Sequence, residues 1–109
     1  MDIKDLAGKK ITVMGLGLHG GGIGTIRFLA EAGARLTVTD LKSEAELSSS
    51  IEKLKDLENI KYVLGQHRME DFSNADMLIK NPAVRWDNEY VKAALDCNVP
   101  VEMDSSLFF

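Results

Sequence analysis

The stretch that decides the fold is ITVMGLGLHGGGIG, residues 11–24. It joins a short, largely apolar run to a cluster of glycines, and an apolar helical pattern follows. Within the glycines lies the pattern G-x-G-x-x-G, as Gly15, Gly17 and Gly20. A strand, a tight glycine turn and a helix start are typical of sites where bare backbone N–H groups hold a phosphate. We therefore predict a nucleotide site at this turn, with a purely structural turn as the alternative.

An acidic residue follows the glycine turn at the expected distance. Asp40 ends a second strand-like run, residues 35–39, about twenty residues further on. In a dinucleotide-binding domain this carboxylate would accept a hydrogen bond from a ribose hydroxyl. Equally, it could be a carboxylate stabilised by the dipole of the next helix. Lys42 could place its ammonium near a nucleotide or be an ordinary solvated lysine.

Strand and helix patterns alternate along the chain. We expect strands at residues 11–14, 35–39, 60–64, 77–79 and 99–103. Helices are expected at residues 22–32, after the capping box Ser43–Glu46, and after Asp87 or Asn88, with Val91, Ala94 and Leu95 on an apolar stripe. Alternation of this kind implies right-handed crossovers. The predicted fold class is α/β: one Rossmann-like, doubly wound domain over residues 1–109, with a mostly parallel five-stranded sheet.

In such a sheet, ligands bind beyond the carboxyl ends of the strands. This rule selects the loops at residues 15–22, 40–43, 65–67 and 81–84, which we expect to converge on one crevice. The two histidines, His19 and His67, fall in these loops. For His19 we favour a role of its backbone over a contact of its ring with phosphate, and for His67 a local loop contact over a ligand contact.

The composition excludes several functions. The net charge is −4 and no basic tract is present, which argues against a nucleic-acid partner. Cys97 is the only cysteine, so no internal disulfide can form, as is usual in a reducing cytosol. The apolar stretch at residues 11–30 is interrupted by glycines and charges, so we predict no membrane segment. The His and Cys residues lie too far apart to suggest a metal site.

The sequence also lacks recognisable catalytic groups. We find neither a nucleophile beside a base nor the pattern G-x-x-x-x-G-K-[ST] of a P-loop. The last residues, Leu107, Phe108 and Phe109, form an apolar tail. It could fold back onto the core, but we favour a chain cut from a longer protein, with the tail leading into another domain.

Several motifs together resemble one family. They are VMGLGLHG (residues 13–20), VTD (38–40), LGQH (64–67), ADMLIKNPAV (75–84) and VPVEMDSSLFF (99–109). In this order and spacing, along almost the whole chain, the sequence resembles the N-terminal domain of the Mur ligases. Within the family it is most similar to the members that add D-glutamate to UDP-N-acetylmuramoyl-L-alanine.

The resemblance implies an ATP-dependent, amide-bond-forming ligase of peptidoglycan precursor synthesis, located in the cytoplasm. Such a ligase has three domains. The first binds the UDP part of the substrate, the second holds ATP, and the third binds the amino acid. This chain would be the first domain, without a cofactor of its own and inactive alone. ATP and Mg²⁺ would belong to the full-length ligase, and the partners would be UDP-N-acetylmuramoyl-L-alanine and the remaining domains.

The resemblance also implies site residues. The turn would meet the pyrophosphate, the 40–42 loop would border the uridine, and the 81–83 loop would lie beside the nucleotide. The candidate substrate-binding residues are Gly15, Gly17, Leu18, His19, Gly20, Asp40, Leu41, Lys42, Asn81, Pro82 and Ala83.

The chain departs from the family pattern in the same loops. His19 stands where the family usually has Ser or Thr, and Ala83 stands where it has Gly. The glycine turn is one residue longer than usual. Two other functions are compatible with the glycine fingerprint. One is an NAD-binding domain of an oxidoreductase or a ligand-gated regulator, and the other is a non-catalytic nucleotide-sensing or scaffold module.

Overall fold

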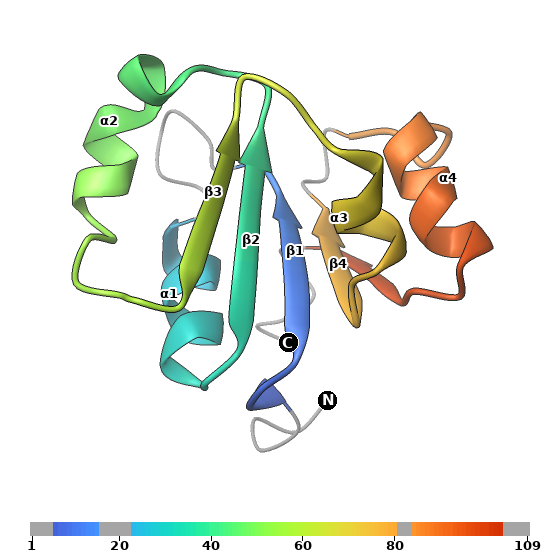
Figure 1. Cartoon of the computed structure of the whole chain (residues 1–109), viewed down its shortest axis with the longest axis horizontal. Helices are drawn as coiled ribbons and strands as arrows, with labels where there is room; N and C mark the ends of the chain where they lie inside the picture. Colours follow the sequence, from blue (N-terminus) through green and yellow to red (C-terminus); the bar gives the residue numbers. More distant parts are fainter. Residues whose placement is uncertain (1–5, 16–22, 81–83, 104–109) are drawn as a thin grey trace.

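The computed structural model of the chain describes residues 6–15, 23–80 and 84–103. Strands and helices alternate through these residues, as the sequence predicts (Figure 1). The elements are β1 (Lys10–Met14), α1 (Ile23–Glu31), β2 (Arg35–Asp40), α2 (Glu44–Glu52), β3 (Ile60–Leu64), α3 (Met69–Ser73), β4 (Met77–Lys80), α4 (Glu89–Asp96) and β5 (Val101–Met103).

Among the described residues, the strands form one five-stranded sheet in the order β3-β2-β1-β4-β5. All four pairings between neighbouring strands are parallel. From β1 the chain winds outward to β2 and β3, then crosses back to add β4 and β5 on the other side (Figure 1). The order therefore reverses between β1 and β4, and the predicted doubly wound α/β fold is confirmed.

Each face of the sheet packs against its own pair of helices. On one face, Ile11 and Val38 lie in a core with Ile26 and Leu29 of α1 and Leu47 of α2. The other face has a second core.

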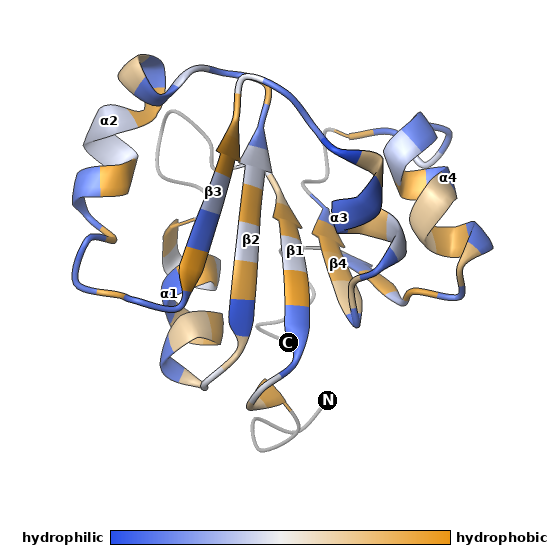
Figure 2. Ribbon diagram, viewed as in Figure 1, coloured by the Kyte–Doolittle hydropathy of each residue, from blue (hydrophilic) through white to orange (hydrophobic). Residues whose placement is uncertain are grey.

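This second core contains Met14 and Leu78, together with Phe72 of α3 and Val91 and Ala94 of α4. Apolar and polar residues alternate along β1 and β2 (Figure 2), because successive side chains of a strand point to opposite faces.

The predicted N-terminal caps of α2 and α4 are present, and the structure shows which of two candidate residues caps α4. The side chain of Ser43 accepts a hydrogen bond from the N–H of Glu46, whose carboxylate accepts from the N–H of Ser43, which is the predicted capping box. Asn88, rather than Asp87, is the N-cap of α4. Gly33 follows α1 with a φ of 94°, a value that favours glycine at a helix end.

Three details differ from the prediction. Helix α3 was not expected, because its five residues are too few to show a helical repeat. β5 begins at Val101 instead of Val99, since the N–H of Val99 is used by the carbonyl of Ala94 at the end of α4. Leu95 is 45% exposed, so the apolar stripe of α4 is narrower than predicted.

One amide side chain joins three segments of the first core. Asn59 Nδ2 donates to the carbonyl of Ala30, at 2.9 Å, and to that of Ala34, at 2.6 Å. These carbonyls flank the turn between α1 and β2, and Asn59 directly precedes β3. The amide therefore holds the α1–β2 turn to the start of β3.

We expect Asn59→Ala to lower the free energy of unfolding by about 1–3 kcal/mol, because two partly buried carbonyls lose their donor. Asn74→Ala is the control, since Asn74 is exposed and should change stability by less than about 0.5 kcal/mol. Urea unfolding of both variants measures the difference. Equal stability of the two would show that the amide contributes nothing.

Candidate functional site

The glycine turn leaves β1 at the carboxyl edge of the sheet, beside the reversal of strand order. Gly15 has a φ of 100°, a conformation that residues with a side chain rarely adopt. Its N–H donates to the carbonyl of Thr39 in β2, at 2.8 Å. The chain therefore needs glycine at the first position of the predicted phosphate turn.

The remaining candidates in two of the predicted loops lie outside the described residues. They are Gly17, Leu18, His19 and Gly20 in the glycine turn, and Asn81, Pro82 and Ala83 after β4.

The turn after β2 holds the other three candidates. Asp40 is 8% exposed, and its Oδ1 accepts the backbone N–H of Lys42 at 2.9 Å. This contact shapes the turn, and it belongs to neither of the two roles that the sequence suggested for Asp40. Leu41 is 66% exposed and Lys42 is exposed as well. An aliphatic and a cationic side chain are thus available to a ligand at the end of β2.

Backbone hydrogen bonds bring the predicted loops together. Gly65 N donates to the carbonyls of Asp40 and Lys42, both at 2.9 Å, so the loop after β3 lies against the loop after β2. A hollow of about 370 Å³ lies beside these loops, and its lining includes Ser43, Tyr62 and Gly65. The predicted convergence is therefore seen for the loops that follow β2 and β3, and the bond from Gly15 places the start of the glycine turn beside them.

His67 contacts residues of β2, α3 and α4, so its partners extend beyond the loop contact that the sequence suggested. Thr39 Oγ1 donates to the carbonyl of Gln66 and lies 2.7 Å from His67 Nδ1. The imidazole meets the rings of Phe72 and Tyr90 edge-on. Burial lowers the pKa of His67, and the nearby charge of Asp40 offsets this only in part.

Lys80 is a residue of the site edge that the sequence analysis missed. It ends β4 and is 1% exposed. Its Nζ donates to the carbonyl of Val84 at 2.7 Å and lies 4.8 Å from the centre of the Trp86 ring. The sequence held one signal for this residue: Lys80 is the lysine that ends an apolar strand, and it directly precedes the candidate residues 81–83.

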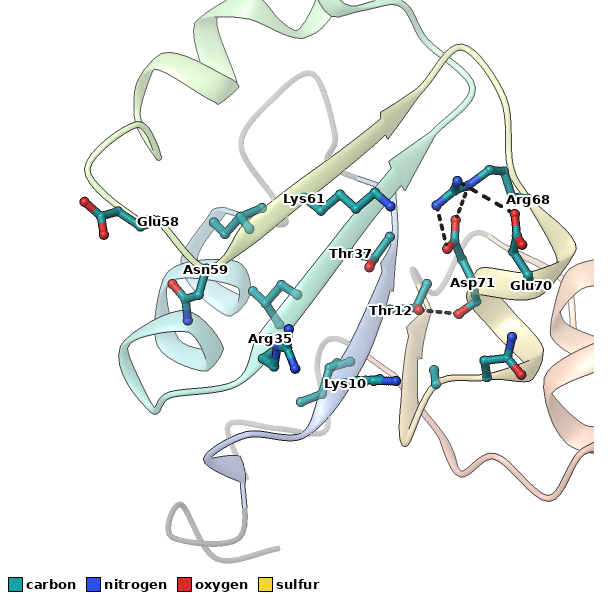
Figure 3. Close-up of a pocket in the computed structure, with 15 residues that line it drawn as sticks. Lys10, Thr12, Arg35, Thr37, Glu58, Asn59, Lys61, Arg68, Glu70 and Asp71 are labelled. Carbon is teal, nitrogen blue, oxygen red and sulfur yellow. Dashed lines mark hydrogen bonds and ion pairs between the residues drawn. The ribbon is translucent and has the colours of Figure 1, made fainter.

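A larger hollow, about 600 Å³, lies elsewhere, on the sheet face over β1, β2 and β3 (Figure 3). Lys10, Arg35 and Lys61 come from these three strands, and Arg68 forms an ion pair with Asp71 at 2.9 Å. None of the candidate residues in the described part of the chain lines it. Because it lies away from the carboxyl edge, we assign the site to the edge and not to this hollow.

In the described ranges, no helix is long and apolar enough to cross a membrane. Within the same ranges, no three His, Cys, Asp or Glu side chains are grouped so that they could hold a metal ion.

A parallel sheet with its glycine turn at the reversal of strand order defines a Rossmann-like α/β domain. The family model described as Mur ligase MurD-like, N-terminal domain, matches residues 9–102. The chain therefore belongs to the Mur ligase family, as the sequence motifs indicate.

Relatives in two spirochaetes agree with this assignment. A protein named UDP-N-acetylmuramoylalanine–D-glutamate ligase from Treponema pallidum (strain Nichols) is 50% identical over 104 residues, which are 94% of this chain and 20% of the relative. A protein of the same name from Borreliella afzelii (strain PKo) is 50% identical over 109 residues, 99% of this chain and 23% of the relative. The chain thus spans about a fifth of the length of these relatives.

Solved structures show the same fold. A pseudomurein peptide ligase type C from Methanothermus fervidus superposes with a TM-score of 0.69 at 23% identity, over 91% of this chain and 20% of that one. UDP-N-acetylmuramate–alanine ligase from Thermotoga maritima gives 0.65 at 24% identity, over 92% and 22%. Shikimate dehydrogenase from Aquifex aeolicus gives 0.60 at only 14% identity, over 94% and 45%, so the fold extends beyond ligases.

We expect acid to destabilise the fold through His67. Its pKa is lowered in the folded state, so the unfolded chain binds this proton more readily. The stability that neutral His67 contributes is fully present above about pH 6.5 and is lost as the pH falls through the lower, folded-state pKa.

The measurement is the melting temperature at pH 7.5 and at pH 5. The melting temperature should fall less between pH 7.5 and pH 5 in His67→Gln than in the unmodified chain, because glutamine keeps polar atoms near Thr39 but does not titrate. His19 is present in both proteins, so the difference reports His67 alone. An identical drop in both would contradict the argument.

Proposed function

We propose that this chain is the UDP-binding N-terminal domain of a ligase that adds D-glutamate to UDP-N-acetylmuramoyl-L-alanine in the cytoplasm. The observation that carries the proposal is the 50% identity, over nearly the whole chain, to relatives named UDP-N-acetylmuramoylalanine–D-glutamate ligase. Because the chain spans only about a fifth of those relatives, the whole reaction is proposed for a longer protein.

The geometry of the carboxyl edge supports UDP as the ligand. The turn that Gly15 begins would receive the diphosphate on its backbone N–H groups. The uridine would lie by the exposed side chains of Leu41 and Lys42, beside the hollow next to Gly65. We assign the 81–83 segment to the other side of the nucleotide.

In this proposal Asp40 acts mainly through the shape of its turn. Its Oδ1 already accepts the N–H of Lys42, which fixes the loop that carries the two exposed side chains. A carboxylate accepts several hydrogen bonds, so this contact leaves Asp40 able to accept one from a ligand hydroxyl, and the ligand titration below decides between UDP and NAD.

ATP and Mg²⁺ belong to the proposal only for the complete ligase. The sequence has no P-loop pattern, and in the described part of the chain no group of acidic side chains converges to hold a metal. The described residues therefore offer no site for these groups. We propose that the domain binds and orients the UDP-linked substrate, that the remaining domains supply catalysis, and that neither nucleic acid nor membrane is a partner.

We expect UDP and UDP-N-acetylmuramoyl-L-alanine to bind more tightly than NAD or ATP. The Kd of the chain alone should be on the order of 0.1–1 mM, because contacts from other domains are missing. NMR titration of the 109-residue chain with each of the four ligands measures the order. A clear preference for NAD would support the oxidoreductase or regulator alternative and overturn the proposal.

Lys42→Ala should weaken UDP binding about 10- to 100-fold, because one hydrogen bond to a charged group is lost. The melting temperature should barely change, since exposed lysines contribute little to stability. Lys61→Ala is the matched control, because Lys61 is also exposed but lies in the larger hollow away from the edge. Equal affinity of the two variants at low salt would remove Lys42 from the site.

A further inference from the structure

We propose that the hollow over β1, β2 and β3 is a second binding site, for a small molecule that carries two or more phosphate groups. This site lies on the face of the sheet, away from the carboxyl edge that we assign to UDP. The two sites share none of the described candidate residues.

The hollow exists because half of one sheet face is left open. In the described part of the chain, α3 and α4 cover this face near β4 and β5, where Leu78 and Phe72 are buried. No described helix covers the same face over β2 and β3 (Figure 1). Parallel strands are usually covered on both faces. The open region, about 600 Å³, has the size of a small-molecule site.

Three cationic side chains from neighbouring strands line the hollow. Lys10 of β1 and Arg35 of β2 are partners in the register of the sheet. Lys61 of β3 is the partner of Thr37, two residues after Arg35. Paired residues of neighbouring strands, and residues two apart on one strand, point to the same face. The three cations therefore share the open face, where Figure 3 shows Lys61 extending from β3 across β2.

The positive charge of these three side chains is not compensated by the described residues. All three are exposed, and among the described residues none of their side chains takes part in an ion pair or a hydrogen bond. The fourth cation of the lining, Arg68, pairs with Asp71 at 2.9 Å and with Glu70 at 3.7 Å. Glu58 is exposed, and its carboxylate is turned away from β2 (Figure 3). The hollow is thus locally positive on a chain whose net charge is −4.

This pattern of charge selects the class of ligand. β1 and β3 are two strand spacings apart, about 10 Å, so an anion that contacts all three cations needs its charge spread along its length. A phosphate group carries a charge of about −1.5 to −2 at neutral pH and three acceptor oxygens, whereas a carboxylate carries a single charge. The guanidinium of Arg35 matches two phosphate oxygens, and Thr37 and Asn74 add a hydroxyl and an amide to the lining. Linked phosphate groups therefore fit the hollow in charge, length and hydrogen bonding.

The probe is inorganic tripolyphosphate, added to the 109-residue chain at low salt and followed by NMR. We expect it to shift the resonances of Thr37, Lys61 and their neighbours on the open face. Shifts confined to Gly15 and the 40–42 loop would place the probe at the carboxyl edge and overturn the second site.

Arg35→Gln and Lys61→Gln each remove one charge and keep a polar side chain. Lys92→Gln is the matched control, because Lys92 is exposed on α4 and does not line the hollow. The Kd for tripolyphosphate, read from the open face, should rise about 10- to 100-fold in the first two variants and less than about twofold in the control. An equal rise in all three would indicate general attraction to positive charge and overturn the site. Should Arg35→Gln not fold, Lys10→Gln takes its place with the same criteria.

Two other anions test the assigned class of ligand. Orthophosphate has one phosphate group, and citrate has only carboxylates. Each should bind at least about tenfold more weakly than tripolyphosphate, since each loses a charge-assisted contact. Equal affinity for either anion would overturn the requirement for linked phosphate groups. UDP binding is read from other resonances, those of Gly15 and the 40–42 loop, so failure of this proposal is distinguishable from failure of the proposed function.

Discussion

The parallel pairing of β1 with strands on both sides is the constraint on which the site depends. β1 pairs with β2 on one side and with β4 on the other. The connections from these strands run to opposite sides of the sheet, so the chain leaves the carboxyl end of β1 between them. Parallel strands end at the same edge, which collects the loops after β1, β2, β3 and β4 there. The glycine at position 15 allows that exit, because its positive φ turns the chain sharply away from the strand.

Much of this fold could be predicted because its signals are local. Strand runs, helical patterns and a capping box depend on neighbouring residues, and they placed most elements correctly. Helix α3 could not be found in this way, since its five residues are held by the burial of Phe72 against Tyr90 and not by an intrinsic repeat. Burial of Lys80 is equally a tertiary property of the sheet, although its partners Val84 and Trp86 lie close by in the sequence.

The candidate site shows the same division between local and tertiary information. The glycine pattern predicted that the site lies at the carboxyl edge of the sheet, and the longer motifs indicated the family. The sequence left two roles open for Asp40, a ribose contact and a place near the next helix dipole, and the bond to the N–H of Lys42 is a third feature that the sequence did not predict. For His67 the local contact could be favoured beforehand, because a short loop after a strand offers nearby hydroxyl and carbonyl groups. Of its ring partners, Phe72 lies in the next helix, whereas Tyr90 comes from α4, further along the chain.

The polar hollow over β1, β2 and β3 has a mechanical consequence for the sheet. All four residues of β4 are buried, whereas β3 has only one buried residue among its five. Parallel strands are usually covered on both faces, so β3, at the end of the strand order, has less packing to lose on opening. Opening of the sheet at β3 would therefore expose less buried side-chain surface than opening at β4.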